Sequence, residues 1–205
     1  MVSDSDEPRA RLLAAVIAYV QQTGISILSL RELAAAIGTS HRMLLYHFGS
    51  REGLLIAIVR AVEESQRALL AELYSDPSLS LADIVRGMWQ RLADPHLWPN
   101  ERLFFELYSQ ALQGHPGTVG LLDGIVDAWV APSIASLIRR GVSPMNAAAE
   151  ARLGVAVTRG LLLDLLATGD RAAVDAAVER YIAYIAALTD HGPDGPASHA
   201  ASARE

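Results

Sequence analysis

The 205-residue sequence contains no cysteine and no lysine. Without cysteine, neither a disulfide framework nor a thiolate metal site is available. No apolar run is long and uninterrupted enough to span a bilayer. The first residues are acidic, whereas a secretory signal begins with basic ones. These absences predict a cytoplasmic protein with no membrane partner.

Strand signals are missing as well. Valine and isoleucine do not alternate with polar residues, and no Asn-Gly or Asp-Gly pair separates β-like runs. Apolar residues recur instead at three- and four-residue spacing between capping signals. We therefore predict an all-α fold of about nine helices. An N-terminal three-helix domain would precede a C-terminal helical bundle.

The negative charge is unevenly distributed. The formal net charge is -6, yet residues 9–52 hold five arginines against Glu32 and Glu52. Residues 53–205 carry twelve arginines against eighteen acidic residues. A basic segment attached to an acidic remainder suits local binding to the phosphates of a nucleic acid.

Capping signals divide the chain into helices. Capping boxes start helices at Ser29 and Ser80, and Asn100 is interpreted as a third cap. Pro132 predicts a kink inside its helix. Helical segments are predicted over residues 8–23 (ended by Gly24), 30–37, 40–48, 51–74, from 80 onward, 100–112, from 117 to 140, 143–168 and 170–189. The divisions are an acidic tail (1–8), a DNA-binding domain (9–52), a helical domain for ligand binding and dimerisation (53–189) and a disordered tail (190–205).

Residues 30–48 meet the steric demands of a helix-turn-helix. Ala34 lies where the second helix crosses the first, and a larger side chain would separate them. Gly38 can take the positive φ that the sharp turn requires. Four apolar residues would form the small core against the first helix: Leu33, Ile37, Leu44 and Phe48.

Residues 38–54, GTSHRMLLYHFGSREGL, resemble the signature of the tetracycline-repressor (TetR) family. That signature has Gly, a small residue and Ser, then Leu-Tyr, His-Phe, Lys-Glu and Leu at fixed spacing. Two positions differ, because Leu45 stands where the family usually has Tyr and Arg51 where it usually has Lys. The first change removes a hydroxyl expected to contact phosphate, and the second keeps the cation.

The resemblance implies that the helix over residues 40–48 enters the major groove of a double-stranded, pseudo-palindromic operator. Arg42 is the main candidate for base contact, because its guanidinium matches guanine O6 and N7. His41 could contact a base singly, and Met43 a thymine methyl. Phosphate contacts are assigned to Ser29, Arg31, Thr39, Ser40, Tyr46, His47 and Arg51. Each of these could instead be a solvated surface side chain, and His47 could be packed between helices.

Aromatic residues concentrate in the helices after the DNA-binding domain. Five of them either fill a bundle core or line an apolar cavity for a small-molecule effector: Trp89, Phe104, Phe105, Tyr108 and Trp129. No cofactor and no metal are expected. The last two helices carry wide apolar stripes that need a covering surface, which predicts a homodimer. The resemblance implies a repressor that its effector releases from DNA.

Two other classes of protein remain as alternatives. An enzyme is disfavoured, because no Ser/His/Asp order, Gly-rich phosphate loop or metal-spaced His/Glu set stands out. The second alternative is an architectural helical protein that binds nucleic acid through its basic segment without sequence preference. Its binding would depend on salt but not on sequence.

Overall fold

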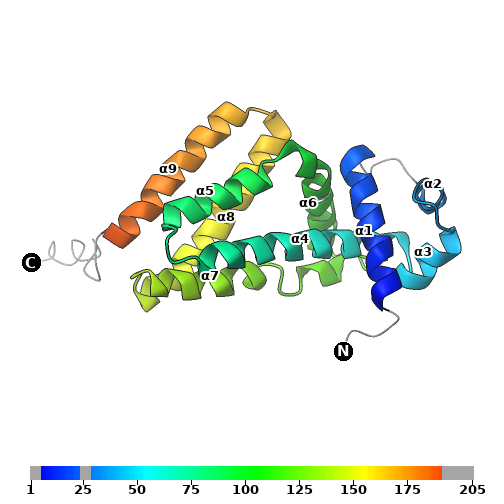
Figure 1. The fold of residues 1–205 in the computed structure, drawn as a ribbon, viewed down its shortest axis with the longest axis horizontal. Helices are drawn as coiled ribbons and strands as arrows, with labels where there is room; N and C mark the ends of the chain where they lie inside the picture. Colours follow the sequence, from blue (N-terminus) through cyan, green and yellow to red (C-terminus); the bar gives the residue numbers. More distant parts are fainter. Residues whose placement is uncertain (1–5, 24–28, 191–205) are drawn as a thin grey trace, which may run out of the picture. The chain divides into compact units, whose positions relative to one another are not determined.

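The computed structural model describes residues 6–23 and 29–190, and within them every regular element is helical (Figure 1). These residues contain nine α-helices and two short 3₁₀ helices, which confirms the predicted all-α fold. The α-helices are α1 (Asp6–Thr23), α2 (Leu30–Ala36), α3 (His41–Phe48), α4 (Arg51–Ser75), α5 (Leu81–Leu92), α6 (Trp98–Leu112), α7 (Asp127–Arg139), α8 (Pro144–Thr168) and α9 (Arg171–Asp190). The 3₁₀ helices are η1 (Pro95–Leu97) and η2 (Val119–Leu122). The predicted stop at Gly24, most of the acidic N-terminal tail and residues 191–205 of the predicted C-terminal tail lie outside the described residues, whereas Asp190 ends α9.

The predicted helix starts at Ser29 and Ser80 are confirmed as capping boxes. The Ser29 hydroxyl accepts from the Glu32 N–H at 3.3 Å, and the Glu32 carboxylate accepts from the Ser29 N–H at 2.8 Å. Ser80 and Asp83 exchange the same two hydrogen bonds at the start of α5. These pairs satisfy backbone donors that a helix start leaves without partners.

The predicted cap at Asn100 is wrong. Helix α6 begins two residues earlier, at Trp98, directly after η1. Asp94 caps η1 by accepting from the His96 N–H at 2.9 Å, and Pro99 favours the first turn of α6. Asn100 therefore lies inside the helix, where its side chain is buried.

The continuous helix predicted up to residue 140 is also wrong. Gly124 adopts φ +69° and separates η2 from α7, while Pro132 lies inside α7 as predicted. The stretch Val119–Arg139 is long and apolar enough to cross a membrane by length and composition, contrary to the expectation that no segment is. Core helices of other proteins meet the same two criteria. A span also requires backbone bonding that the break at Gly124 interrupts.

The chain forms two compact units, each built from two stretches of sequence. Unit 1 comprises Met1–Gln66 and Asp94–Asp123, and in it α1 packs against α6 and α2 against α3 (Figure 1). Unit 2 comprises Arg67–Ala93 and Gly124–Glu205, and in it α5 packs on α9, and α8 packs on both α7 and α9. The predicted boundary at residue 52 falls inside unit 1 and stays a prediction.

The apolar stripes predicted on the last two helices are partly used within unit 2. Six residues of those stripes are buried among the helices of this unit: Leu162, Leu165, Val174, Val178, Ile182 and Ile185. Leu153 of those stripes is 42% exposed, and outside them Leu163 and Tyr184 are 50% and 42% exposed. Gly160 lies between the two leucines on α8, and a side-chain carbon there would meet no atom within 4 Å. The two terminal helices thus have a partly apolar outer surface of low relief.

Candidate nucleic-acid interface and effector site

The turn between α2 and α3 has the geometry that the sequence predicts. Gly38 adopts φ +71°, and the Thr39 N–H donates to the Ala34 carbonyl at 2.8 Å. Ala34 is 1% exposed, so no larger side chain fits at that position without moving its neighbours. The Ser40 hydroxyl then caps α3 by accepting from the Met43 N–H at 3.2 Å.

Helix α3 is also attached to α1. The Arg9 Nε donates to the His47 carbonyl at 3.4 Å, and the Arg9 guanidinium carbon lies 5.2 Å from the centre of the Phe48 ring. Phe48 and Leu44 are buried on the inner side of α3. This attachment through Arg9 holds α3 by one side and leaves the opposite side open.

The exposed face of α3 consists of Arg42, Met43, Leu45 and Tyr46. Tyr46 is 80% exposed, Met43 41% and Leu45 37%. Exposure of three large apolar or aromatic side chains on one eight-residue helix is unusual for a surface that faces only water. His41 and His47 are half-buried at its edges, and the His47 ring packs edge-on to Tyr46 at 5.0 Å.

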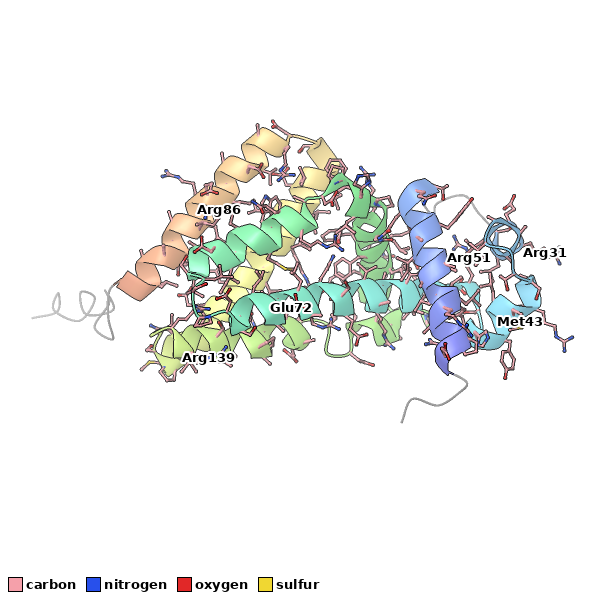
Figure 2. The ribbon with its side chains drawn as sticks, in the orientation of Figure 1. Arg31, Met43, Arg51, Glu72, Arg86 and Arg139 are labelled. Atoms are coloured by element: carbon pink, nitrogen blue, oxygen red, sulfur yellow. The ribbon has the colours of Figure 1, made fainter. Side chains whose placement is uncertain are left out.

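Three arginines of this region are exposed and make no hydrogen bond or ion pair with other described residues: Arg31, Arg42 and Arg51. Figure 2 labels Arg31 on α2, Met43 on α3 and Arg51 at the start of α4. Guanidinium groups without protein partners are available to phosphate oxygens or base edges. Arg9, by contrast, is used in holding α3.

The two serines predicted to contact phosphate act as helix caps. Ser29 is bound to Glu32, and these hydrogen bonds hold the pKa of the Glu32 carboxyl below its usual value, with the backbone bond from Ser29 contributing most. Ser40 is bound to the Met43 N–H. Their phosphate contacts, like those of the other predicted residues, stay predictions.

Three of the five aromatic residues predicted for an effector site lie together in unit 1. The Phe104 ring stacks on Tyr108 at 5.4 Å and meets Phe105 edge-on at 5.2 Å. Phe104 is buried, whereas Phe105 and Tyr108 are half-buried. They form one aromatic cluster along α6.

The other two aromatic residues lie in unit 2, each with a partner of its own. The Trp89 indole N–H donates to the Asp175 carboxylate at 2.7 Å, which joins α5 to α9. The Trp129 ring lies 5.9 Å from the guanidinium carbon of Arg67. This hydrogen bond gives Trp89 a role in helix packing, and its assignment to an effector site stays a prediction.

Sequence reasoning did not identify a buried polar group in unit 1. The Gln66 amide on α4 donates to the Glu101 carboxylate on α6, and both side chains are buried. Asn100 is 2% exposed, and among the described residues neither its amide oxygen nor its amide nitrogen has a hydrogen-bond partner. The helical spacing of Asn100 with the buried Leu103, Phe104 and Leu107 was the available signal, because it puts the amide on the packed face of α6.

Comparison with known proteins agrees with this description. Residues 12–58 match the family model of bacterial regulatory proteins, tetR family. An uncharacterized HTH-type transcriptional regulator, YvaF of Bacillus subtilis, is 31% identical over 78 residues. That alignment spans 38% of this chain and 40% of the relative, which is less than half the length of either protein.

Similarity to solved structures extends over most of the chain. A putative TetR-family transcriptional regulator from Rhodococcus sp. has a TM-score of 0.69 and 22% identity, covering 90% of this chain and 99% of that one. The multidrug binding protein EbrR, solved in complex with imidazole, has a TM-score of 0.60 and 28% identity, covering 87% and 90%.

The matched family and the Bacillus and Rhodococcus relatives are regulators and not enzymes, in agreement with the prediction for this chain. The helix-turn-helix signature, the family match over residues 12–58 and the shared all-α fold lead to one assignment. Residues 12–58 match the TetR family of bacterial regulatory proteins, and the chain as a whole shares the fold of solved TetR-family regulators.

Proposed function

We propose that the protein is a cytoplasmic, sequence-specific transcriptional repressor that a small-molecule effector releases from its operator. The observation that carries the DNA-binding half is the exposed face of α3. It presents Arg42, which has no partner among the described residues, on a helix attached from behind through Arg9, Leu44 and Phe48. A positioned guanidinium in the major groove can bind guanine O6 and N7 at once.

Replacement of Arg42 by alanine tests the DNA-binding half. An operator is first selected from randomised duplexes, and affinities for it and for unrelated DNA are then measured at fixed salt. Loss of one bidentate base contact should cost about 1–3 kcal/mol, or roughly 5- to 150-fold, on the operator. The matched control is Arg91→Ala, because Arg91 on α5 is also exposed and makes no hydrogen bond or ion pair with other described residues.

Each result discriminates between functions. An equal loss on all DNA sequences would reduce Arg42 to a phosphate contact. Failure of the selection to enrich any sequence, together with strong salt dependence, would favour the architectural alternative.

Unit 1 supports the effector half of the proposal. The aromatic cluster of Phe104, Phe105 and Tyr108 offers apolar rings, and Asn100 offers a buried amide that lacks a donor and an acceptor. A buried amide without partners is costly, so a ligand that completes its hydrogen bonds would be favoured. We infer an effector with an apolar or aromatic part and an adjacent polar group.

Unit 1 also contains the DNA-binding helices, and in it α6 packs against α1. A ligand against α6 could change the arrangement of α1 to α3, provided that it binds two arrangements with different affinities. EbrR is described as a multidrug binding protein, and a comparable role here is part of this proposal.

The effector is sought by screening compound libraries for release of the selected operator. A releasing compound should bind the wild type and protect it against thermal unfolding. Asn100→Ala should still bind the operator but respond only at higher concentrations of the compound. If no compound lowers operator affinity, the protein is a constitutive regulator and the effector half fails.

A homodimer through α8 and α9 is the third element of the proposal. The exposed Leu153, Leu163 and Tyr184, with the open Gly160 between the leucines, suit close packing against the same surface of a second copy. A two-fold dimer would present two α3 helices to a pseudo-palindromic operator. Leu163→Arg should give a monomer in analytical ultracentrifugation, whereas the control Leu112→Arg, at a 64% exposed site on α6, should not. A wild-type monomer at micromolar concentration would contradict the dimer.

A further inference from the structure

Helix α3 carries two apolar side chains that its packing does not explain. Leu44, between them in sequence, is 1% exposed and belongs to the core, whereas Met43 and Leu45 are 41% and 37% exposed. Isolated exposed apolar residues are common on any surface. These two side chains lie on either side of Arg42 on the exposed face of α3, which is the face proposed to contact DNA.

The spacing fixes how these side chains are arranged. At about 100° per residue, Arg42 and Met43 lie on either side of Tyr46, one turn before it. Leu45 lies on the same side as Arg42, three residues further along the helix. Neighbours at this spacing have Cβ atoms about 5–6 Å apart, which corresponds to between one and two base-pair steps of about 3.4 Å.

We propose that Leu45 contacts a thymine methyl group within two base pairs of the guanine that Arg42 binds. This inference rests on the proposed DNA-binding function and specifies which sequences it recognises. In the major groove the 5-methyl group of thymine is the one apolar feature of a base edge. A leucine side chain has no donor or acceptor, so it can discriminate bases only through that methyl.

The inference gives Leu45 a role of its own. The family usually has Tyr at this position, and its replacement looks from sequence like the loss of a phosphate contact. A phosphate contact is the same on every DNA sequence. An exposed leucine beside a guanine-binding arginine would replace it by a contact with a base, which depends on the sequence. The operator half-site should therefore contain a guanine and a nearby thymine.

Uracil substitution tests this directly, because uracil differs from thymine only by the missing methyl. Each thymine of the selected operator is replaced singly, and affinity is measured for the wild type and for Leu45→Ala. Removal of one contacted methyl should weaken wild-type binding about fourfold, equivalent to about 0.8 kcal/mol. At the thymine that Leu45 contacts, replacement by uracil should leave the operator affinity of Leu45→Ala unchanged.

The matched control is Leu112→Ala, which removes an equally large exposed leucine from α6 and should keep the full uracil effect. Leu45→Tyr is a second variant that preserves a large side chain, and it should also lose the uracil effect. Circular dichroism of each variant checks that the helices are retained.

The outcomes separate this inference from the function on which it depends. If Arg42→Ala loses operator preference but no uracil substitution changes wild-type affinity, the inference on Leu45 is overturned and the proposed function stands. An unchanged uracil effect in both Leu45 variants overturns it equally. If the wild type prefers no sequence at all, the proposed function and this inference fall together.

Discussion

Replacing Trp89 by phenylalanine removes one hydrogen-bond donor from the contact between α5 and α9. In the native chain the indole N–H donates to Asp175 at 2.7 Å, and the Arg171 Nε contacts the same carboxylate at 2.7 Å. Arg171 also donates to the Ala93 carbonyl at 3.1 Å. Trp89 therefore belongs to a network that joins the end of α5 to the start of α9.

The size of the effect follows from the surroundings of Asp175. A hydrogen bond to a charged group contributes about 1.5–3 kcal/mol when its partner is removed from water. Asp175 is 41% exposed and keeps Arg171, so water replaces part of the lost bond. We expect a coupling energy of about 1 kcal/mol between Trp89 and Asp175 in a double-mutant cycle with Asp175→Ala. The cycle also cancels the cost of the smaller ring.

The effect should depend on pH. Burial raises the pKa of the Asp175 carboxyl, but hydrogen bonds from Trp89 and Arg171 outweigh it and hold this pKa below its usual value. A carboxyl whose pKa is lowered by folding stabilises the native state above its unfolded pKa of about 3.9. That contribution is lost as the pH falls through the lower folded value. The stability difference between wild type and Trp89→Phe should shrink below about pH 4.

Urea unfolding at pH 7 and at a series of acidic pH values measures both quantities. A coupling energy below about 0.3 kcal/mol would be indistinguishable from additivity and would refute the structural role of this hydrogen bond. If Trp89→Phe keeps wild-type stability but no longer responds to an effector, Trp89 belongs to the ligand site instead.

Three further predictions concern caps and glycines. Gly38→Ala should destabilise the protein by about 1 kcal/mol in urea unfolding, because φ is +71° while the space around it is open; a neutral result would show that the turn tolerates a side chain. Ser29→Ala should lower the free energy of unfolding by about 1 kcal/mol at pH 7. Because folding lowers the pKa of Glu32, this difference should decline as the pH falls through the folded pKa, and a constant difference would contradict the capping box. Gly154→Ala should be less favourable in the wild type than in Tyr181→Phe, because the added carbon would lie 2.8 Å from the Tyr181 hydroxyl; equal effects in the two backgrounds would refute that contact.

Sequence reasoning succeeded where a signal and its partner lie within a few residues. The capping boxes at Ser29 and Ser80 and the turn at Gly38 involve side chains and backbone groups at most a turn apart. The predicted cap at Asn100 was wrong because Asp94 and Pro99, also only a few residues away, supply competing signals for an earlier helix start. A capping residue type is informative only when no neighbour starts the helix first.

Pairings across the chain were not predictable. The contact between Phe104 and Tyr108 could be predicted, because the two residues are one turn apart on α6. Contacts between different helices could not. The partner of Trp89 is 86 residues away. The bond between Gln66 and Glu101 crosses 35 residues. Such contacts depend on which helices pack together, and periodicity gives the apolar face of a helix without giving its neighbour.

The division of unit 1 into two stretches of sequence has a consequence for how the chain folds as it is synthesised. The DNA-binding helices come first, but α1 packs on α6, which is complete only at Leu112. A ribosome therefore exposes α1 to α3 before their packing partner exists. The part of α1 that α6 covers stays exposed for several seconds of synthesis at about 5–20 residues per second. Truncations after residue 66 would make that transient state permanent, so the DNA-binding part of this protein is a product of the later sequence as much as of its own.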